Sequence, residues 1–217
     1  MVLRFFEKPA RFEYVHKWLN KPKTKILDVG CGNHSHSRTK RHYPECRYYG
    51  LDKTPQHDIS KEDLVCMEQF FEVDLSNPDG LSLIPDRFFD CILLSHVIEH
   101  LENGMEIIAC LLHKLVKGGV IYLEFPSPKS VNFPSMKGTL NFYDDPTHVK
   151  IYQLEEIAAL FSDNEFDIIK AGTRRSLKRI LFLPLYSLVS LVSHGYIGGS
   201  VLWDIFGFAN NLIAVKK

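Results

Sequence analysis

Apolar residues follow two kinds of pattern along this chain. Phe12, Val15, Trp18 and Leu19 are three, three and one residues apart, and this spacing predicts an amphipathic leading helix over residues 9–20. Other apolar residues form short continuous runs, such as FFDCILLS at 88–95, which are typical of strands buried on both faces of a parallel sheet. The runs predict strands within 24–33, 46–52, 70–74, 88–95, 120–126, 166–173 and 210–216, and helical spacing predicts helices over 97–116 and 152–162.

Strands that alternate with helices indicate a single fold class. Right-handed crossovers between successive strands give a mostly parallel sheet with helices on both faces. We therefore expect an α/β, doubly wound, Rossmann-like fold that forms one domain over residues 1–217. Sheets of this kind bind ligands at the carboxyl ends of their strands, so candidate chemistry is sought there.

Composition narrows the class of protein. The 26 basic and 26 acidic residues give a formal net charge of zero, which disfavours nucleic acid as a partner. The five cysteines, Cys31, Cys46, Cys66, Cys91 and Cys110, are an odd number without C-x-x-C pairs, which favours reduced thiols and a cytoplasmic location. The first residues, MVLRFFEKPARFEYV, show no apolar core of signal-peptide length, so we do not expect secretion.

Residues 96–100, HVIEH, allow two interpretations. On a helix His96 and His100 would share one face, and the pattern matches an H-x-x-E-H zinc-peptidase signature. A zinc site needs a third ligand, and no neighbouring residue supplies one at a clear spacing. We therefore expect no bound metal, and treat His100 as a packed helix residue and His96 as a contact to cofactor or substrate.

Acidic residues and glycines gather at the predicted strand ends. Asp28, Gly30 and Gly32 lie where the first strand meets its loop, and glycine there lets a ligand approach the backbone closely. Asp52 ends the second strand, 24 residues after Asp28, where a carboxylate can accept the two hydroxyls of a ribose. A dinucleotide motif would have a third glycine where this chain has Ser35, which argues against a nicotinamide cofactor.

These motifs resemble those of the class I S-adenosylmethionine-dependent methyltransferases, over roughly residues 24–175. ILDVGCGN is similar to the family's first motif, YYGLDK to its ribose-binding acid and EVDLS to its adenine-side turn. FDCILLSHVIEHL and LVKGGVIYLEFP are similar to its fourth strand with the following helix and to its fifth strand. The resemblance implies a seven-stranded sheet with an antiparallel last strand and S-adenosylmethionine as the cofactor. One departure is His34, where many members have a further glycine.

The resemblance also implies roles for individual residues. The backbone from Gly30 to Gly32 would hold the methionine portion of the cofactor, above Asp28, and Asp52 would hold the ribose. Asp74 and Leu75 would contact the adenine, and Ser95 and His96 would line the sulfonium end. The implied cofactor-binding residues are thus Asp28, Gly30, Cys31, Gly32, Asp52, Lys53, Asp74, Leu75, Ser95 and His96.

Residues 126–149 form a long predicted loop, and a loop of this length in a compact domain is usually functional. It contains NFYDDPTHVKIY at 141–152, and similar DPTHV segments occur in relatives that methylate sugars and related small hydroxylated acceptors. We therefore expect O-methylation of a sugar, glycan or similar small molecule. His148 is the candidate base, with Asp144 or Asp145 orienting it or the acceptor; alternatively, Asp145-Pro146 only makes a turn.

Residues 177–206 are unusually apolar, and ILFLPLYSLVSLVS at 180–193 carries no charge. Pro184 interrupts the segment, which is also too short to span a bilayer, so we expect it to lie in a membrane interface at the inner face or against a second copy of the chain. Alternatively, it covers the sheet as ordinary core. A protein that binds S-adenosylmethionine without catalysis and docks through 177–206 is the competing functional hypothesis.

Overall fold

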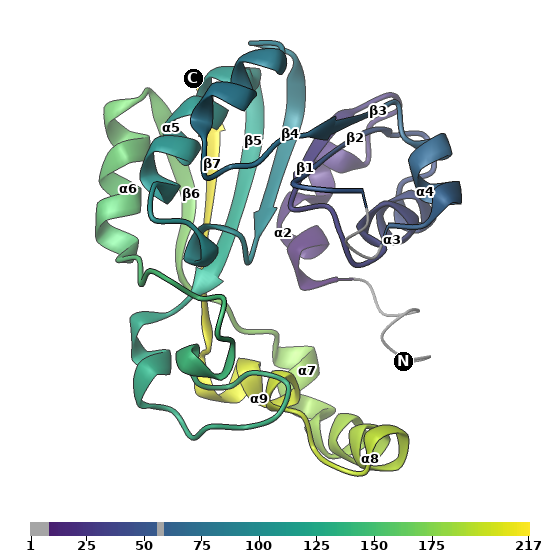
Figure 1. The fold of residues 1–217 in the computed structure, drawn as a ribbon, viewed down its shortest axis with the longest axis vertical. Coiled ribbons are helices and arrows are strands. Elements are labelled where there is room, and N and C mark those ends of the chain that lie inside the picture. The colour runs from purple at the N-terminus through teal and green to yellow at the C-terminus, as the bar shows by residue number, and fades with distance from the viewer. Residues whose placement is uncertain (1–8, 56–58) are drawn as a thin grey trace.

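The computed structural model describes residues 9–55 and 59–217, and its centre is one seven-stranded sheet (Figure 1). The strand order is β3-β2-β1-β4-β5-β7-β6, in which β1 to β5 pair in parallel and β7 runs antiparallel to both of its neighbours. The prediction of a mostly parallel, Rossmann-like sheet with an antiparallel last strand is confirmed. The strands are β1 Lys25–Val29, β2 Arg47–Asp52, β3 Gln69–Glu72, β4 Phe89–Ser95, β5 Leu115–Pro126, β6 Phe166–Thr173 and β7 Ala209–Lys216.

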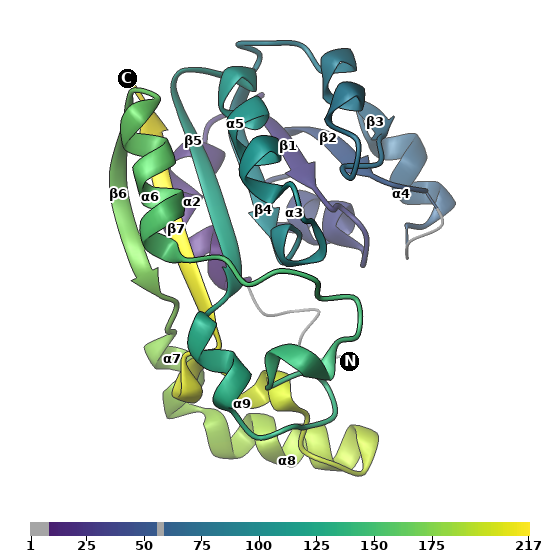
Figure 2. The same ribbon diagram turned by 60° about the vertical axis from the view of Figure 1, so that its left-hand side comes forward.

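Helices cover both faces of the sheet (Figure 2). Apolar residues of α5 and α6 pack in one buried cluster, and those of α2 pack in a second cluster on the opposite face. The α-helices are α2 Ala10–Leu19, α3 Ser35–His42, α4 Lys61–Cys66, α5 Gly104–Lys114, α6 Leu154–Asp163, α7 Leu177–Leu181, α8 Leu183–His194 and α9 Gly199–Phe206. Short 3-10 helices are η1 Pro78–Leu83, η2 Ile98–His100, η3 Pro128–Asn132 and η4 Phe142–Asp144.

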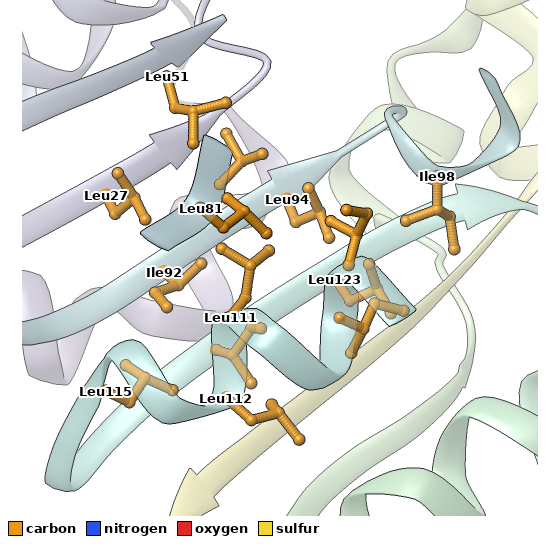
Figure 3. Packing of buried hydrophobic residues seen from close by; sticks show 14 of the residues in the cluster. Leu27, Leu51, Leu81, Ile92, Leu94, Ile98, Leu111, Leu112, Leu115 and Leu123 are labelled. Atoms are coloured by element: carbon orange, nitrogen blue, oxygen red, sulfur yellow. The ribbon is translucent and has the colours of Figure 1, made fainter. Parts of the chain in front are cut away.

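The packing of β4 on both faces of the sheet explains why its sequence is almost wholly apolar. Ile92 and Leu94 point into the cluster with α5, near Leu111, as Figure 3 shows. Cys91 and Leu93 alternate with them and belong to the cluster with α2. Because side chains of a strand alternate between faces, covering both faces requires apolar residues at successive positions.

The prediction of one helix over 97–116 is wrong at both ends. Residues 98–100 form only the 3-10 helix η2, and α5 begins at Gly104. The backbone carbonyl of Glu99 accepts hydrogen bonds from the amides of Val149 (2.8 Å) and Lys150 (3.2 Å), so it is used by the loop instead of by a helix. At the other end α5 stops at Lys114, because Leu115 already pairs with Phe89 and begins β5.

Beyond the carboxyl ends of β4 and β5, the loop 126–149 and helices α7 to α9 form a second layer of structure (Figures 1 and 2). The loop is joined to α9 by hydrogen bonds from the Gly199 amide to the Lys137 carbonyl (2.7 Å) and from Trp203 Nε1 to the Thr139 carbonyl (2.5 Å). Within the described residues, no helix is both long and apolar enough to cross a membrane. The loop and the helices α7 to α9 stand over the strand ends where the candidate chemistry lies.

Candidate active site

The glycine loop after β1 is held close to the segment that follows β4. The amides of Gly30 and Cys31 donate to the Leu51 carbonyl at 2.8 and 3.1 Å, and Gly30 has a left-handed φ of 69°. A Cβ on Gly30 would lie only 2.6 Å from Cγ2 of Val97. His34, at the departure from the family pattern, takes a φ of 55°, so the chain makes this left-handed turn without glycine at a cost of about 1–2 kcal/mol.

Asp28 supports this loop from beneath. It is buried, and its Oδ2 accepts hydrogen bonds from Ser35 Oγ (2.5 Å) and Tyr48 Oη (2.8 Å), with the Arg11 guanidinium 3.7 Å away. The neighbouring Cys31 thiol is also buried, and burial together with the charges of Asp28 and Asp52 raises its pKa far above the usual range. The Asp28 carboxylate therefore fixes the loop, and Cys31 stays a neutral thiol.

The acids at the ends of β2 and β3 lie along the same edge of the sheet. Asp52 Oδ2 accepts from the Gly32 amide (3.1 Å) and Oδ1 from the Lys53 amide (2.8 Å), so it joins the glycine loop to the end of β2. Lys53 Nζ lies 2.9 Å from Asp74 Oδ2. Hydrogen bonds from Lys53 and Ser76 lower the pKa of Asp74 to about 2, while Leu75 beside it is buried.

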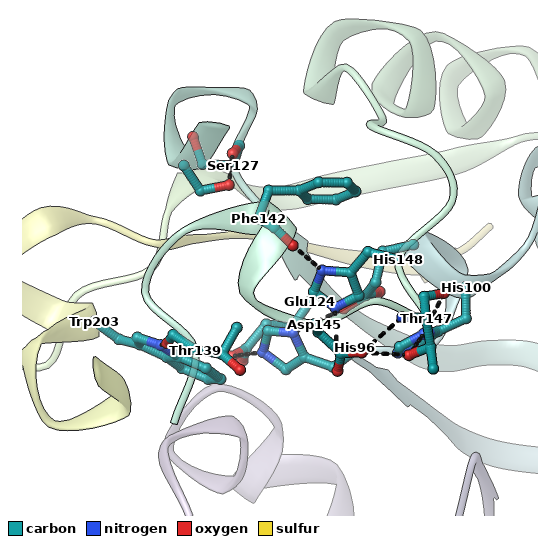
Figure 4. A network of polar contacts seen from close by, with 12 residues as sticks. His96, His100, Glu124, Ser127, Thr139, Phe142, Asp145, Thr147, His148 and Trp203 are labelled. Carbon is teal, nitrogen blue, oxygen red and sulfur yellow. Dashed lines mark hydrogen bonds and ion pairs between the residues drawn. The ribbon is translucent and has the colours of Figure 1, made fainter. Parts of the chain in front are cut away.

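Ser95 and His96 follow directly at the end of β4. Among the described residues, the buried Ser95 Oγ has no hydrogen-bond partner. His96 Nδ1 lies 3.0 Å from Glu99 Oε1 and Nε2 lies 3.1 Å from Glu124 Oε1 (Figure 4). Burial opposes a charge on His96, but its hydrogen bonds to the carboxylates of Glu124 and Glu99 outweigh burial and raise the pKa of His96 to about 9. His96 is therefore an imidazolium that donates from both nitrogens at neutral pH.

Glu124, Arg174 and Asp204 form a buried network that the sequence reasoning missed. Arg174 Nε lies 3.1 Å from Glu124 Oε1, and Nη1 lies 3.5 Å from Asp204 Oδ1. Burial alone would raise the pKa of Glu124, but Arg174 and His96 lower it to about 2. The available signal was an acid inside the apolar strand VIYLEFP, since a buried carboxylate in such a run requires a partner.

His148 is brought to the end of β4 by the loop. Its side chain is 5% exposed, Nδ1 donates to the Phe142 carbonyl at 2.7 Å, and Nε2 lies 3.9 Å from Asp145 Oδ2. The ring centre lies 4.9 Å from that of His100. Figure 4 shows the two residues near one another. Because Nδ1 carries the donated proton, the neutral ring has its lone pair on Nε2.

Asp144 and Asp145 are used differently. Asp144 Oδ2 accepts from the amides of Met136, Leu140 and Asn141 at 3.0, 2.8 and 2.8 Å. Despite the raising effect of burial, these bonds and one from Ser135 lower the pKa of Asp144 to about 2. Asp144 thus organises the loop, and only Asp145 of this pair faces His148.

The two histidines of HVIEH do not share a helix face. His96 has a left-handed φ of 55° and donates to two carboxylates, whereas His100 donates from Nδ1 to the Thr147 carbonyl at 3.1 Å. Both ring nitrogens of His96 are engaged with carboxylates, so His96 and His100 do not present the paired free nitrogens of an H-x-x-E-H motif in this geometry. The helix that would place them together does not form, because the chain turns at His96.

Comparison with known proteins shows to which protein family the chain belongs. A sequence profile described as Methyltransferase domain matches residues 4–171. The chain belongs to this methyltransferase family. No curated protein matches the sequence.

Solved structures share the fold of this methyltransferase. An S-adenosylmethionine-dependent methyltransferase from Archaeoglobus fulgidus is 19% identical, with a TM-score of 0.60 over 95% of this chain and 92% of that one. A putative sarcosine dimethylglycine methyltransferase from Galdieria sulphuraria is 14% identical, with a TM-score of 0.64 over 96% and 84%. The magnesium protoporphyrin IX methyltransferase from Synechocystis, solved with bound S-adenosylmethionine, is 15% identical, with a TM-score of 0.56 over 94% and 77%.

The protein is an S-adenosylmethionine-dependent methyltransferase, and S-adenosylmethionine is its cofactor. The strand-end geometry fits this group. Ser95 Oγ, at the end of β4, lies buried without a partner among the described residues and so has a hydrogen bond to offer a bound group. When bound, the cofactor supplies an electrophilic methyl group on a positively charged sulfur.

Proposed function

We propose that this methyltransferase transfers a methyl group to a hydroxyl of a sugar, a glycan or another small hydroxylated acceptor. The observation that carries the proposal is His148, whose Nδ1 is fixed on the Phe142 carbonyl while Nε2 keeps its lone pair, 3.9 Å from Asp145 Oδ2. A hydroxyl acceptor requires a group that receives its proton as the new bond forms, and a neutral imidazole is suited to this.

On this proposal the cofactor-facing residues are those at the ends of β1, β2, β3 and β4. Asp52 and the Gly30-to-Gly32 backbone would hold the ribose and methionine portions, and Ser95 Oγ would gain its missing partner. Asp74 and Leu75 would meet the adenine. Asp28, Cys31, Lys53 and His96 would support these contacts, the first and last through the buried hydrogen bonds described above.

The proposed transfer is an in-line displacement. The acceptor oxygen forms a bond to the methyl carbon as the carbon–sulfur bond breaks, and its electron pair stays on sulfur. The hydroxyl proton passes to His148 Nε2, and Asp145, 3.9 Å away, stabilises the imidazolium that forms. Alignment of oxygen, carbon and sulfur supplies much of the rate, because displacement depends on near-attack geometry.

The test is a methyl-transfer screen with radiolabelled S-adenosylmethionine against sugars, glycans, phenols, lipid headgroups and amines. The wild-type protein should label a hydroxyl acceptor, and His148→Ala should lower kcat by about 10²–10⁴-fold with unchanged cofactor affinity. His113→Ala, on the exposed side of α5, is the matched control and should keep full activity. Labelling of amines alone would refute the hydroxyl proposal, and full turnover by His148→Ala would return His148 to a turn-making role.

We also propose that α7 and α8 dock the protein on an anionic lipid surface. Neither helix is core: no residue of α7 is buried within the described part of the chain, and Ser190 alone is buried in α8. Large apolar side chains stand exposed on both helices at spacings of four, seven and four, namely Leu177 (82%), Leu181 (74%), Leu188 (58%) and Val192 (79%). Arg174 and Arg179 pair with the buried Asp204, whereas Arg175 and Lys178 are exposed. The exposed charge beside these apolar side chains is therefore positive and complements anionic headgroups.

Vesicle sedimentation tests the docking proposal. The protein should bind phosphatidylglycerol-containing vesicles more tightly than pure phosphatidylcholine, and Leu188→Glu should abolish binding while the fold is retained. Val65→Glu, at an even more exposed apolar residue of α4, is the control on a different surface. If Leu188→Glu abolishes self-association and wild-type protein ignores vesicles, the surface is a homodimer contact and the lipid proposal fails.

The experiments that test these two proposals also distinguish a methyltransferase from a cofactor-binding protein without catalysis. That alternative predicts binding of S-adenosylmethionine and docking, but no labelled product with any acceptor in the screen. A cytoplasmic location, at the inner face of a membrane, follows from the proposed docking and is tested by fractionation of cells that express the protein.

A further inference from the structure

Two neighbouring residues after β4 and a third from the distant loop present metal-ligating atoms to one another. Glu99, His100 and His148 each offer one ligand atom, and the three atoms lie within 4.8 Å of one another. Val149 and Lys150 donate their amides to the Glu99 carbonyl, which fixes the end of the loop against η2. The cluster is therefore built by the backbone as well as by the side chains.

Both imidazoles are held in the tautomer that a metal requires. His100 Nδ1 donates to the Thr147 carbonyl at 3.1 Å, and His148 Nδ1 donates to the Phe142 carbonyl at 2.7 Å. Each ring is thereby left with a lone pair on Nε2. Histidines that bind metals characteristically donate their other nitrogen to a carbonyl or carboxylate in this way, because it fixes the tautomer and the ring orientation.

Glu99 supplies the independent sign that a ligand is missing. Its side chain is 1% exposed, Oε1 is taken by His96 Nδ1, and Oε2 has no hydrogen-bond partner among the described residues. An unpartnered carboxylate oxygen at this depth costs free energy unless a cation or donor meets it. The Asp145 carboxylate lies 3.9 Å from His148 Nε2, so a second acidic side chain stands beside the cluster.

We propose that Glu99, His100 and His148 bind one divalent transition-metal ion of the zinc, cobalt and manganese class. Imidazole nitrogen with a carboxylate suits these ions better than Mg²⁺ or Ca²⁺, which prefer oxygen ligands throughout. Metal–ligand bonds of about 2.0–2.2 Å require the three atoms to close by about 1–1.5 Å, within the range of side-chain rotation.

The role of the ion rests on the proposed hydroxyl methylation. An ion at this position takes the acceptor oxygen as a further ligand and lowers the pKa of its hydroxyl, so the proton leaves to solvent before or as the oxygen–methyl bond forms. The Nε2 lone pair of His148 then holds the ion and does not receive the proton. Metal binding itself can be measured without any acceptor.

The experiment uses the full chain, stripped with a chelator and titrated with Co²⁺. Visible d–d absorption should develop to one equivalent and disappear when Zn²⁺ is added. His100→Ala and His148→Ala should each weaken Co²⁺ binding by at least about a hundredfold, whereas His113→Ala, an exposed histidine elsewhere, should leave it unchanged. Circular dichroism checks each variant's fold, and His100→Ala is the more conservative change because the His100–Thr147 contact is exposed.

Absence of stoichiometric Co²⁺ binding by the wild-type protein, or binding that survives in both histidine variants, would overturn the site. Stoichiometric binding without any hydroxyl methylation would leave the site standing and refute the proposed function. Full methyl transfer by a chelator-treated protein that also binds no Co²⁺ would overturn the metal site and leave the proposed function standing. The His148 lone pair would then serve proton transfer.

Discussion

Substitution of Gly30 by alanine tests the close approach between the glycine loop and the segment after β4. Two costs can be separated. A left-handed φ of 69° costs a residue with a Cβ about 1–2 kcal/mol, and the 2.6 Å contact with Val97 Cγ2 adds an overpacking cost of about 1–3 kcal/mol. Gly30→Ala should therefore lower the free energy of unfolding by about 2–5 kcal/mol, a large share of the total for a domain of this size.

The chain offers a control for each cost. Gly195 has a φ of 76°, and a Cβ there would meet no other described atom within 4 Å, so Gly195→Ala should report the backbone cost alone, about 1–2 kcal/mol. Val97→Ala removes the methyl group that a Cβ on Gly30 would strike. The double variant Gly30→Ala/Val97→Ala should therefore be less destabilised than the sum of its parts, by about 1–3 kcal/mol.

Urea unfolding followed by tryptophan fluorescence measures the wild-type protein and all four variants, since Trp18 and Trp203 lie in different parts of the fold. Two results would refute the reasoning. A Gly30→Ala cost equal to that of Gly195→Ala would mean that no close contact exists, and additive costs in the double variant would mean that Val97 is not the obstacle.

Three further predictions follow from hydrogen bonds of the site. Asp52→Asn should weaken S-adenosylmethionine binding in calorimetry by about tenfold or more, since a charged hydrogen bond contributes about 1.5–3 kcal/mol; wild-type affinity would remove Asp52 from the cofactor site. Asp144→Ala should destabilise the loop by about 1–3 kcal/mol and speed its proteolysis, because backbone amides lose their acceptor; an unchanged cleavage rate would contradict this. Glu124 has a pKa of about 2 folded against 4.5 unfolded, so its contribution to stability is complete above pH 4.5 and is lost as the pH falls toward 2. In Glu124→Gln the unfolding free energy should fall less steeply over that range, and an unaltered slope would show that Glu124 is not the titrating group.

Much of the cofactor side of the site could be predicted from the sequence because its determinants are local. A strand that ends in a glycine turn or an acid places that residue at the sheet edge, and a parallel sheet brings all such edges together. Gly30, Asp52 and Ser95 lie at the ends of β1, β2 and β4 for this reason. The exposed helices α7 and α8 show the limit of the same approach, since an apolar run fits a buried or a docking segment equally until its exposure is known.

The loop side of the candidate site was decided by tertiary structure. Glu99 and His148 are 49 positions apart, and no local pattern joins them; the loop's hydrogen bonds to the Glu99 carbonyl do so. The same bonds prevent the helix that periodicity predicted over 97–116, because a carbonyl used by the loop is withdrawn from a helical turn. Sequence periodicity determined the sheet and the cofactor edge, where each residue's place follows from its own strand. Beyond that edge, contacts between distant segments decide which side-chain atoms lie together. Those contacts form only when the chain has folded.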